Sequence, residues 1–312
     1  MRRLCLPLCL CALAASAADS RRFEFTSTTR LPAASGKLRV WIPAPLSDAN
    51  QQISQLAIES PVPHRLYRDR EYGNQYAYLE TAAGQPVEVR MKMQVVRREN
   101  RVDPARHNGA RPDPSKLARW LAADRRVPLD GLIASLSASE TGGRATPLEK
   151  ARSVYNYVLA NMRYDKTGDG WGQGDAIFAC NARRGNCTDF HALLIGMLRA
   201  VRIPARFEIG FSIPPAGASG ELPGYHCWAQ FWLEGAGWIP VDASEAWKNP
   251  ARRDYFFGAH DQHRILFTRG RDIRLDPPQQ GEPLNYFVYP YAEADGKPVT
   301  TVESRYWFRN LD

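Results

Sequence analysis

Alternating apolar and polar residues dominate the first third of the chain. Between about residues 21 and 101 they form short runs interrupted by Pro and Gly, as in 36–43 (GKLRVWIP) and 86–99 (PVEVRMKMQVVRRE). A period of two predicts β-strands with one buried face. We therefore expect residues 19–111 to form an N-terminal β domain, either a small sandwich or an extended sheet.

A segment rich in Pro, Gly and Asp follows at 102–116. It predicts a linker, so we place a domain boundary near residue 112. Helical periodicity begins after it. The clearest start is at Thr146, which matches a capping box with Glu149. The expected helices cover 116–123, 129–137 and 146–163.

The stretch 183–207 (RRGNCTDFHALLIGMLRAVRIPARF) organises the second part of the chain. A Gly-Asn turn delivers Cys187 to an apolar run at three-and-four spacing, which predicts a buried helix that stops before Pro204. At the start of a helix, free amides and the positive end of the helix dipole stabilise a thiolate. Cys187 is therefore a candidate nucleophile.

Strand patterns return after Pro204, at 205–214, 224–234 and 237–247. Along 224–234 the period of two sends His226 and Cys227 to opposite faces. The tail from Asp254 onward carries further strand signals, which we expect to complete the sheet of a second domain over 112–312. The predicted fold class is α+β, with the cysteine-bearing helix packed on an antiparallel sheet.

The hairpin formed by the last two of these strands makes a testable geometric prediction. A five-residue connection over 233–237, or a bulge with the same offset, places Asp242 opposite Trp228 and diagonal to His226. We then expect a carboxylate oxygen of Asp242 about 3 Å from a ring nitrogen of His226. The other ring nitrogen should face the sulfur of Cys187.

Composition and the first residues indicate an exported protein. The 312 residues are 44% hydrophobic, enough for one large or two modest domains. Residues 1–18 follow the plan of a signal peptide, with Arg2 and Arg3 before an apolar core and a small-residue cleavage site. The remaining net charge is mildly basic, without the basic-aromatic clusters typical of nucleic-acid binding. We expect a periplasmic or secreted protein without a transmembrane segment.

Removal of the leader leaves three cysteines, Cys180, Cys187 and Cys227. An odd number in an oxidising compartment indicates at least one free thiol and at most one internal disulfide. Whether Cys180 and Cys227 form that disulfide stays open at this point.

Three segments in order, GNCTDFHALLIGMLRAVRIPARFEIGF, YHCWAQFWL and GWIPVDAS, resemble the core of the transglutaminase-like superfamily of cysteine enzymes. The resemblance covers roughly residues 146–245 and implies a papain-like arrangement. It implies that Cys187 is the nucleophile, His226 the general base and acid, and Asp242 the residue that orients the imidazole. In the preceding loop, Trp171 and Gln173 are candidate side-chain donors of an oxyanion hole.

Several alternatives remain for the activity. The chain resembles bacterial exported members more than animal crosslinking enzymes, because Asn186 replaces the usual Gln and no calcium loop of the EF-hand type is visible. We therefore expect hydrolysis of amide bonds in a peptide or protein substrate, including cell-envelope material, ahead of glutamine crosslinking. A binding module that keeps the fold without catalysis is the remaining alternative.

A zinc site is a further alternative by residue type, and it needs its ligands to converge. Strand alternation opposes that convergence, so we expect neither a metal nor a cofactor. The residues weighed for such a site are Cys180, Cys187, His191, His226 and Cys227.

Overall fold

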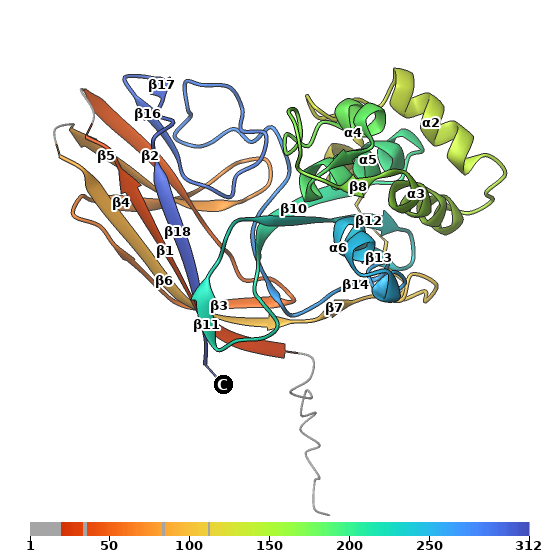
Figure 1. Cartoon of the computed structure of the whole chain (residues 1–312), viewed down its shortest axis with the longest axis horizontal. Helices are drawn as coiled ribbons and strands as arrows, with labels where there is room; N and C mark the ends of the chain where they lie inside the picture. The colour runs from red at the N-terminus through yellow and green to blue at the C-terminus, as the bar shows by residue number, and fades with distance from the viewer. Residues whose placement is uncertain (1–19, 34–35, 83–84, 112, 312) are drawn as a thin grey trace, which may run out of the picture.

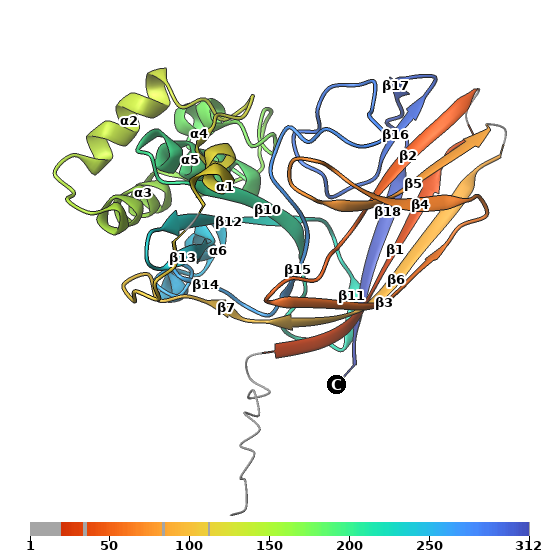
Figure 2. The ribbon, with the colours of Figure 1, turned by 180° about the vertical axis from the view of Figure 1, so that it is seen from behind.

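The computed structural model describes residues 20–311 apart from 34–35, 83–84 and 112, so the predicted signal peptide lies outside the described residues. Two lobes lie side by side (Figures 1 and 2). The β lobe contains two five-stranded antiparallel sheets, and the helical lobe contains helices packed on a four-stranded antiparallel sheet. The predicted α+β class is confirmed.

Ten strands form the β lobe, nine from the two ends of the chain and β11 from between β10 and β12. Its first sheet has the order β11 (Ser219–Glu221), β18 (Glu303–Asn310), β1 (Ser20–Leu31), β6 (Val87–Arg98) and β3 (Gln51–Glu59). Its second sheet has the order β17 (Lys297–Pro298), β16 (Tyr291–Ala294), β2 (Lys37–Ala44), β5 (Gln75–Ala82) and β4 (His64–Arg68).

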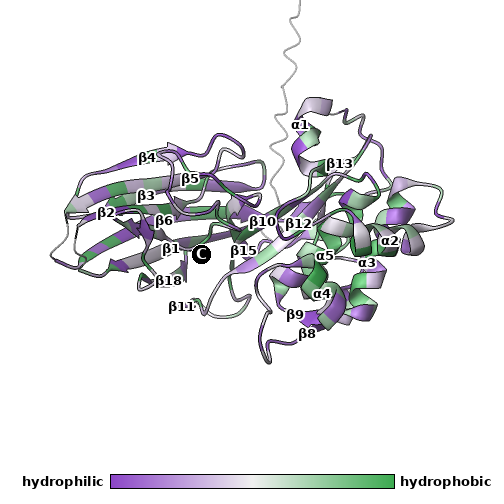
Figure 3. Ribbon diagram, turned by 90° about the horizontal axis from the view of Figure 1, so that it is seen from above, coloured by the Kyte–Doolittle hydropathy of each residue, from purple (hydrophilic) through white to green (hydrophobic). Residues whose placement is uncertain are grey.

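Alternation along these strands produces the core of the β lobe. On β1, Phe23 and Phe25 are buried, and on β6 Met91 and Met93 are buried, with polar residues between them. Hydrophobic and hydrophilic segments alternate along the strands in Figure 3. The apolar faces of the two sheets share one hydrophobic cluster, so the β lobe is a sandwich.

The C-terminal tail departs from expectation. β15 (Arg264–Arg269) pairs with β10 (Ala205–Ser212) in the helical lobe, as we expected of the tail. β16 and β18 pair instead with β2 and β1, so the assignment of these strands to the second domain was wrong. The register places Phe308 opposite Phe25, both buried, which supplies apolar area that the sandwich needs. Residue 112 lies outside the described residues, so the boundary placed there stays a prediction.

The segment predicted as a linker lies on the helical lobe. Asn108 donates its backbone N–H to the carbonyl of Gly235 at 2.6 Å, and Gly235 returns a bond to Ala110 at 2.8 Å. Just before this segment, β7 (Asn100–Arg101) pairs with β14 (Ala259–His260). These bonds hold the linker against the helical lobe.

The helical lobe contains two short helices that the sequence patterns missed. α4 lies in a segment that we expected to be a loop, and α6 follows directly on a strand that we expected to continue. Both begin at an Asp whose side chain accepts from backbone amides of the first turn, Asp175 for α4 and Asp242 for α6. The helices are α1 (Pro114–Ala118), α2 (Gly131–Thr141), α3 (Pro147–Asn161), α4 (Ala176–Ala182), α5 (Cys187–Ala200) and α6 (Ala243–Lys248), with short 3-10 turns at Arg119–Leu121 and Pro250–Arg252.

The four-stranded sheet carries α5 on one face. Its order is β13 (Gly237–Val241), β12 (His226–Leu233), β10 and β15. A two-stranded parallel ribbon, β8 (Arg163–Tyr164) with β9 (Arg184–Gly185), leads into α5. α5 packs against β12 and β10 and against α2, α3, α4 and α6, and every residue from Cys187 to Arg199 is buried. The sheet and the surrounding helices therefore fix the position of Cys187.

Candidate active site

Cys187 is the first residue of α5. Asn186 caps the helix, its Oδ1 accepting from the Thr188 amide at 2.9 Å, and Asp189 completes a capping box by accepting from the Asn186 amide. Asn186 also donates from Nδ2 to the hydroxyl of Tyr225, next to His226. The Asn186 cap therefore fixes the backbone at Cys187 and links the start of α5 to the start of β12.

The hairpin of β12 and β13 has the offset that we expected. Trp232 lies opposite Trp238, and Ala229 lies opposite Val241. The same register, extended by one residue, places Asp242 opposite Trp228. Leu233 and Gly237 also pair, so the connection itself is only the three residues between them. Nε2 of His226 lies 2.8 Å from Oδ2 of Asp242, and the His226 ring and the Cys187 thiol are near enough to shift each other's pKa. The structure thus brings Cys187, His226 and Asp242 together, while their catalytic roles stay a prediction.

The Asp242 carboxylate is held on both oxygens. Oδ1 accepts from the hydroxyl of Ser244 and from the amide of Glu245, each at 3.0 Å, so the residue that faces His226 also caps α6. Oδ2 accepts from Nη1 of Arg264 at 3.1 Å. Nothing in the sequence pattern marked Arg264, which starts a hydrophobic strand and is buried there.

Charge in this buried cluster favours a thiolate and an imidazolium. Burial alone would raise the pKa of the Cys187 thiol, but hydrogen bonds from Cys227 and His226 and the charge of His226 outweigh it and lower that pKa well below its usual value. Burial would lower the pKa of His226, yet Asp242 and the Cys187 thiolate raise it to about 10. Burial would raise the pKa of Asp242, and the charges of His226 and Arg264 lower it instead. All three shifts favour the ionised form of Cys187.

His191 and Cys227 also lie in this cluster, although sequence reasoning gave neither a catalytic role. His191 lies one helical turn after Cys187, and its Nδ1 is 2.7 Å from the Cys187 carbonyl. Its Nε2 accepts from the Ala243 amide at 3.2 Å, so Nδ1 carries the proton. The Cys227 sulfur is 3.6 Å from the same Nδ1, and Cys227 helps to lower the pKa of the Cys187 thiol. His191 therefore contacts the backbone of Cys187 from the same helix, and Cys227 faces this cluster from β12.

This arrangement bears on the zinc and disulfide alternatives. Four of the five residues weighed for zinc lie close together, yet both ring nitrogens of His191 are occupied by protein groups. Within the described residues, no group of three or more His, Cys, Asp and Glu side chains is placed to hold a metal ion. Cys180, Cys187 and Cys227 are all free thiols.

Asp189 anchors the loop that precedes Cys187. Its buried carboxylate accepts from the amides of Gly172 at 2.7 Å and Gly174 at 3.0 Å, in addition to the cap of α5. Sequence reasoning missed this residue, although the Asn-x-x-Asp spacing at the helix start was available as a signal. The side chain of Gln173, between the two glycines, is exposed, and Trp171 is half-buried. The oxyanion role of these two residues stays a prediction.

A cleft of about 760 Å³ opens beside His226. Tyr164 and Tyr225 line it, together with Lys166 and the ion pair between Lys248 and Glu245, whose atoms lie 2.8 Å apart. Cys187 is 2% and His226 5% exposed, and His226 lines this cleft.

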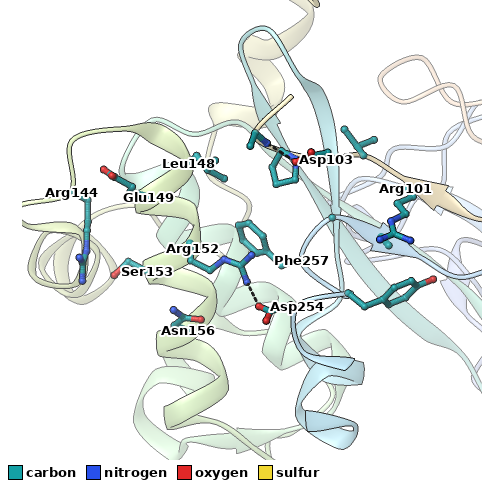
Figure 4. Close-up of a pocket in the computed structure, with 16 residues that line it drawn as sticks. Arg101, Asp103, Arg144, Leu148, Glu149, Arg152, Ser153, Asn156, Asp254 and Phe257 are labelled. Carbon is teal, nitrogen blue, oxygen red and sulfur yellow. Dashed lines mark hydrogen bonds and ion pairs between the residues drawn. The ribbon is translucent and has the colours of Figure 1, made fainter. Parts of the chain in front are cut away.

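A second cavity, of about 700 Å³, lies between α3 and the segment after β7 (Figure 4). Arg152 projects into it from α3, forming an ion pair with Asp254 at 2.9 Å and stacking 3.7 Å from the ring centre of Phe257. None of the three candidate catalytic residues lines it. It is therefore a separate feature from the cleft beside His226.

Comparison with known proteins agrees with this geometry. The model of the transglutaminase-like superfamily matches residues 134–243, which contain α3, α5 and the hairpin that bears His226 and Asp242. The chain has a transglutaminase-like domain. This domain includes all three residues that the sequence comparison singled out.

The remaining similarities extend beyond the transglutaminase-like domain. The chain is 26% identical over 330 residues to an uncharacterized protein of Haemophilus influenzae, covering 92% of this chain and 89% of that protein. It also resembles the crystal structure of a protein from Cytophaga hutchinsonii proposed to be a cysteine protease. There the TM-score is 0.66 at 18% identity, over 94% of this chain and 92% of the other. The shared fold therefore includes the β lobe as well.

Among the described residues, no helix is both long and apolar enough to cross a membrane.

Proposed function

We propose that this protein is an exported cysteine-dependent enzyme that hydrolyses amide bonds through a thioester on Cys187. The observation that carries the proposal is the cluster of the Cys187 thiol at a helix start, the charge of His226 that lowers the pKa of this thiol, and Asp242 2.8 Å from the His226 imidazole. Acyl transfer needs this set, because the thiolate attacks and the imidazolium returns a proton.

The chemistry follows from the positions of the groups. The Cys187 thiolate attacks the amide carbonyl, and His226 gives its proton to the nitrogen as the C–N bond breaks, releasing an amine and leaving a thioester. Water then attacks the thioester, with His226 accepting its proton. The carboxylic acid leaves and the thiolate is regenerated. The backbone amide of Cys187, which as the first of α5 has no helical acceptor, is placed to stabilise the oxyanion.

Two features of the sequence support water as the acceptor and export as the setting. Asn186 stands before the nucleophile in place of the Gln usual in crosslinking enzymes, and here its amide caps α5 and bonds Tyr225. The signal-peptide pattern of residues 1–18 supports export to the periplasm or beyond, where peptides and proteins of the cell envelope are the accessible substrates.

Labelling with a thiol-directed activity probe tests the proposal. We expect rapid modification of Cys187 alone, and loss of labelling when His226 is replaced by Ala. Incubation with cell-wall peptides, proteins and an added amine then separates the products by mass, since hydrolysis adds water and transfer adds the amine. A probe that labels Cys187 no faster than Cys180 would refute an activated thiol.

A further inference from the structure

A small cavity of about 240 Å³ lies where the two lobes meet. Figure 2 shows β10 and β15 running from the helical lobe to this junction. The β lobe contributes Asp48 and Arg97 to the wall, and the helical lobe contributes Arg206, Glu208 and Arg269. Three arginines and two carboxylates thus line one small cavity.

Protein groups already satisfy both carboxylates. Arg269 forms ion pairs with both of them, through Nε to Glu208 Oε1 at 2.7 Å and through Nη2 to Asp48. Glu208 Oε2 accepts from the indole of Trp228 at 2.8 Å and from the amide of Gln230 at 2.9 Å. The two acids therefore have little capacity left for the other arginines.

Arg97 lacks a partner of its own. The residue is only 2% exposed, and its Nε has no hydrogen-bond acceptor. No carboxylate of the described residues lies within ion-pair distance of its guanidinium. Arg206 has a related deficit, since its Nε makes no hydrogen bond and lies 3.4 Å from the already occupied Glu208 Oε1. Burial lowers the pKa of Arg97 to about 10, which leaves it charged at neutral pH.

An unpaired buried charge is costly, and folded proteins pair such groups or bind a counter-ion. The three guanidinium groups exceed the two carboxylates by one positive charge, so the deficit is one of negative charge. Binding sites for larger organic ligands have volumes of roughly 300 Å³ or more, and this cavity is smaller than that. Its size therefore suits a small ion and excludes a peptide or nucleotide.

We propose that this cavity binds a small oxyanion of the phosphate or sulfate type, held by Arg97 and Arg206. Guanidinium N–H groups match the oxygens of such ions, and these two arginines come from β6 and β10, which belong to different sheets. The bound anion stabilises the junction of the lobes. This site is separate from the proposed active site and does not depend on its chemistry.

Thermal unfolding in inorganic phosphate and in sodium sulfate, at constant ionic strength set with sodium chloride, tests the site. We expect the Tm of the unmodified protein to rise with the logarithm of anion concentration for at least one of the two ions. Arg97→Met should lose this rise. Arg98→Met is the matched control, because Arg98 is the exposed neighbour on the same strand, and it should retain the rise. An equal rise in Arg97→Met, or no rise in the unmodified protein, overturns the proposal.

A crystallographic measurement keeps the test decisive if Arg97→Met does not fold. Crystals of the unmodified protein grown with selenate, a sulfate mimic, should show an anomalous selenium peak within hydrogen-bonding reach of Arg97. A cavity without that peak, at a selenate concentration that saturates any thermal shift, rules out the anion site.

Discussion

Arg264 donates a hydrogen bond to Oδ2 of Asp242 at 3.1 Å, the same oxygen that lies 2.8 Å from Nε2 of His226. One buried carboxylate therefore balances two buried cations when the imidazole is protonated. The guanidinium of Arg264 also lies 4.8 Å from the ring centre of Trp228 and is bonded to Asp261. We therefore expect loss of charge at Asp242 to lower both activity and stability.

For Asp242→Asn we expect kcat to fall by about 10²- to 10⁴-fold, because the amide no longer favours the imidazolium. We also expect the free energy of unfolding to fall by about 3 kcal/mol, because Arg264 loses one of two buried counter-charges. Steady-state kinetics and urea denaturation measure the two effects. Ser244→Ala is the matched control, since it removes one hydrogen bond to Asp242 and should cost about 1 kcal/mol while keeping most activity. Full turnover in Asp242→Asn would contradict the orienting role.

Cys187→Ala should abolish turnover, a loss of about 10³-fold or more, because no other group replaces the sulfur. The fold should persist, since the change removes one small buried atom at the first position of α5. Circular dichroism and an assay of released amine check both points. Cys180→Ala, which alters the half-buried thiol of α4, should remain active. Substantial turnover in Cys187→Ala would exclude it as the nucleophile.

The raised pKa of His226 sets the alkaline limit of activity. We expect turnover to fall as pH rises through about 10, where the imidazolium loses its proton. The same shift stabilises the fold. This contribution is complete below the unfolded histidine pKa of about 6.5 and disappears as pH rises through about 10. A pH profile of kcat and of Tm measures both, and an alkaline limb near pH 7 would contradict the pairing with Asp242.

The lowered pKa of Cys187 has its own signature in alkylation. Between pH 6 and 8 the rate of reaction of Cys187 with iodoacetamide should change little, because the thiol is already ionised. Cys180 should react faster at the higher pH, because burial raises its pKa and its thiolate is scarce. Peptide mass spectrometry follows both sites in one sample. In His226→Ala, the rate at Cys187 should become as steep with pH as that at Cys180.

Asp189→Asn tests the fastening of the loop that precedes the nucleophile. A carboxamide has one acceptor oxygen where the carboxylate has two, so it cannot satisfy the amides of Gly172, Gly174 and Asn186 together. We expect about 2 kcal/mol of destabilisation and faster hydrogen exchange at the two glycine amides. Asp169→Asn, an exposed change in the same loop, is the control. Unchanged exchange in Asp189→Asn would show that the loop is held by other contacts.

Local sequence patterns predicted individual helices and strands better than they predicted which strands pair with each other. Strand alternation anticipated β1 and β6, the capping box anticipated the start of α3, and the parity of the hairpin anticipated the contact of His226 with Asp242. The pairing of β18 with β1 was missed because an alternating strand fits several sheets equally well, and only tertiary packing selects among them.

The supporting residues of the site were missed for a similar reason. Arg264 and Asp189 act through contacts with groups far away in the sequence, and a charged residue in an apolar run does not reveal which partner it meets. The short helix α6 was not predicted, because Asp242 was interpreted only as the partner of His226. It is also the N-cap of this helix. A residue with two structural roles gives a weak signal for each.

The position of β18 between β1 and β11 has a consequence for the order of folding. β1 comes first among the described strands and pairs with β18, so the first sheet of the β lobe is complete only after Glu303–Asn310 has been synthesised. Until then β1 keeps an unpaired edge, the feature of a β-protein most prone to intermolecular pairing. A chain that ends before Glu303 would keep that edge permanently, which marks a truncated product for aggregation or degradation even when α5 and its cysteine have formed.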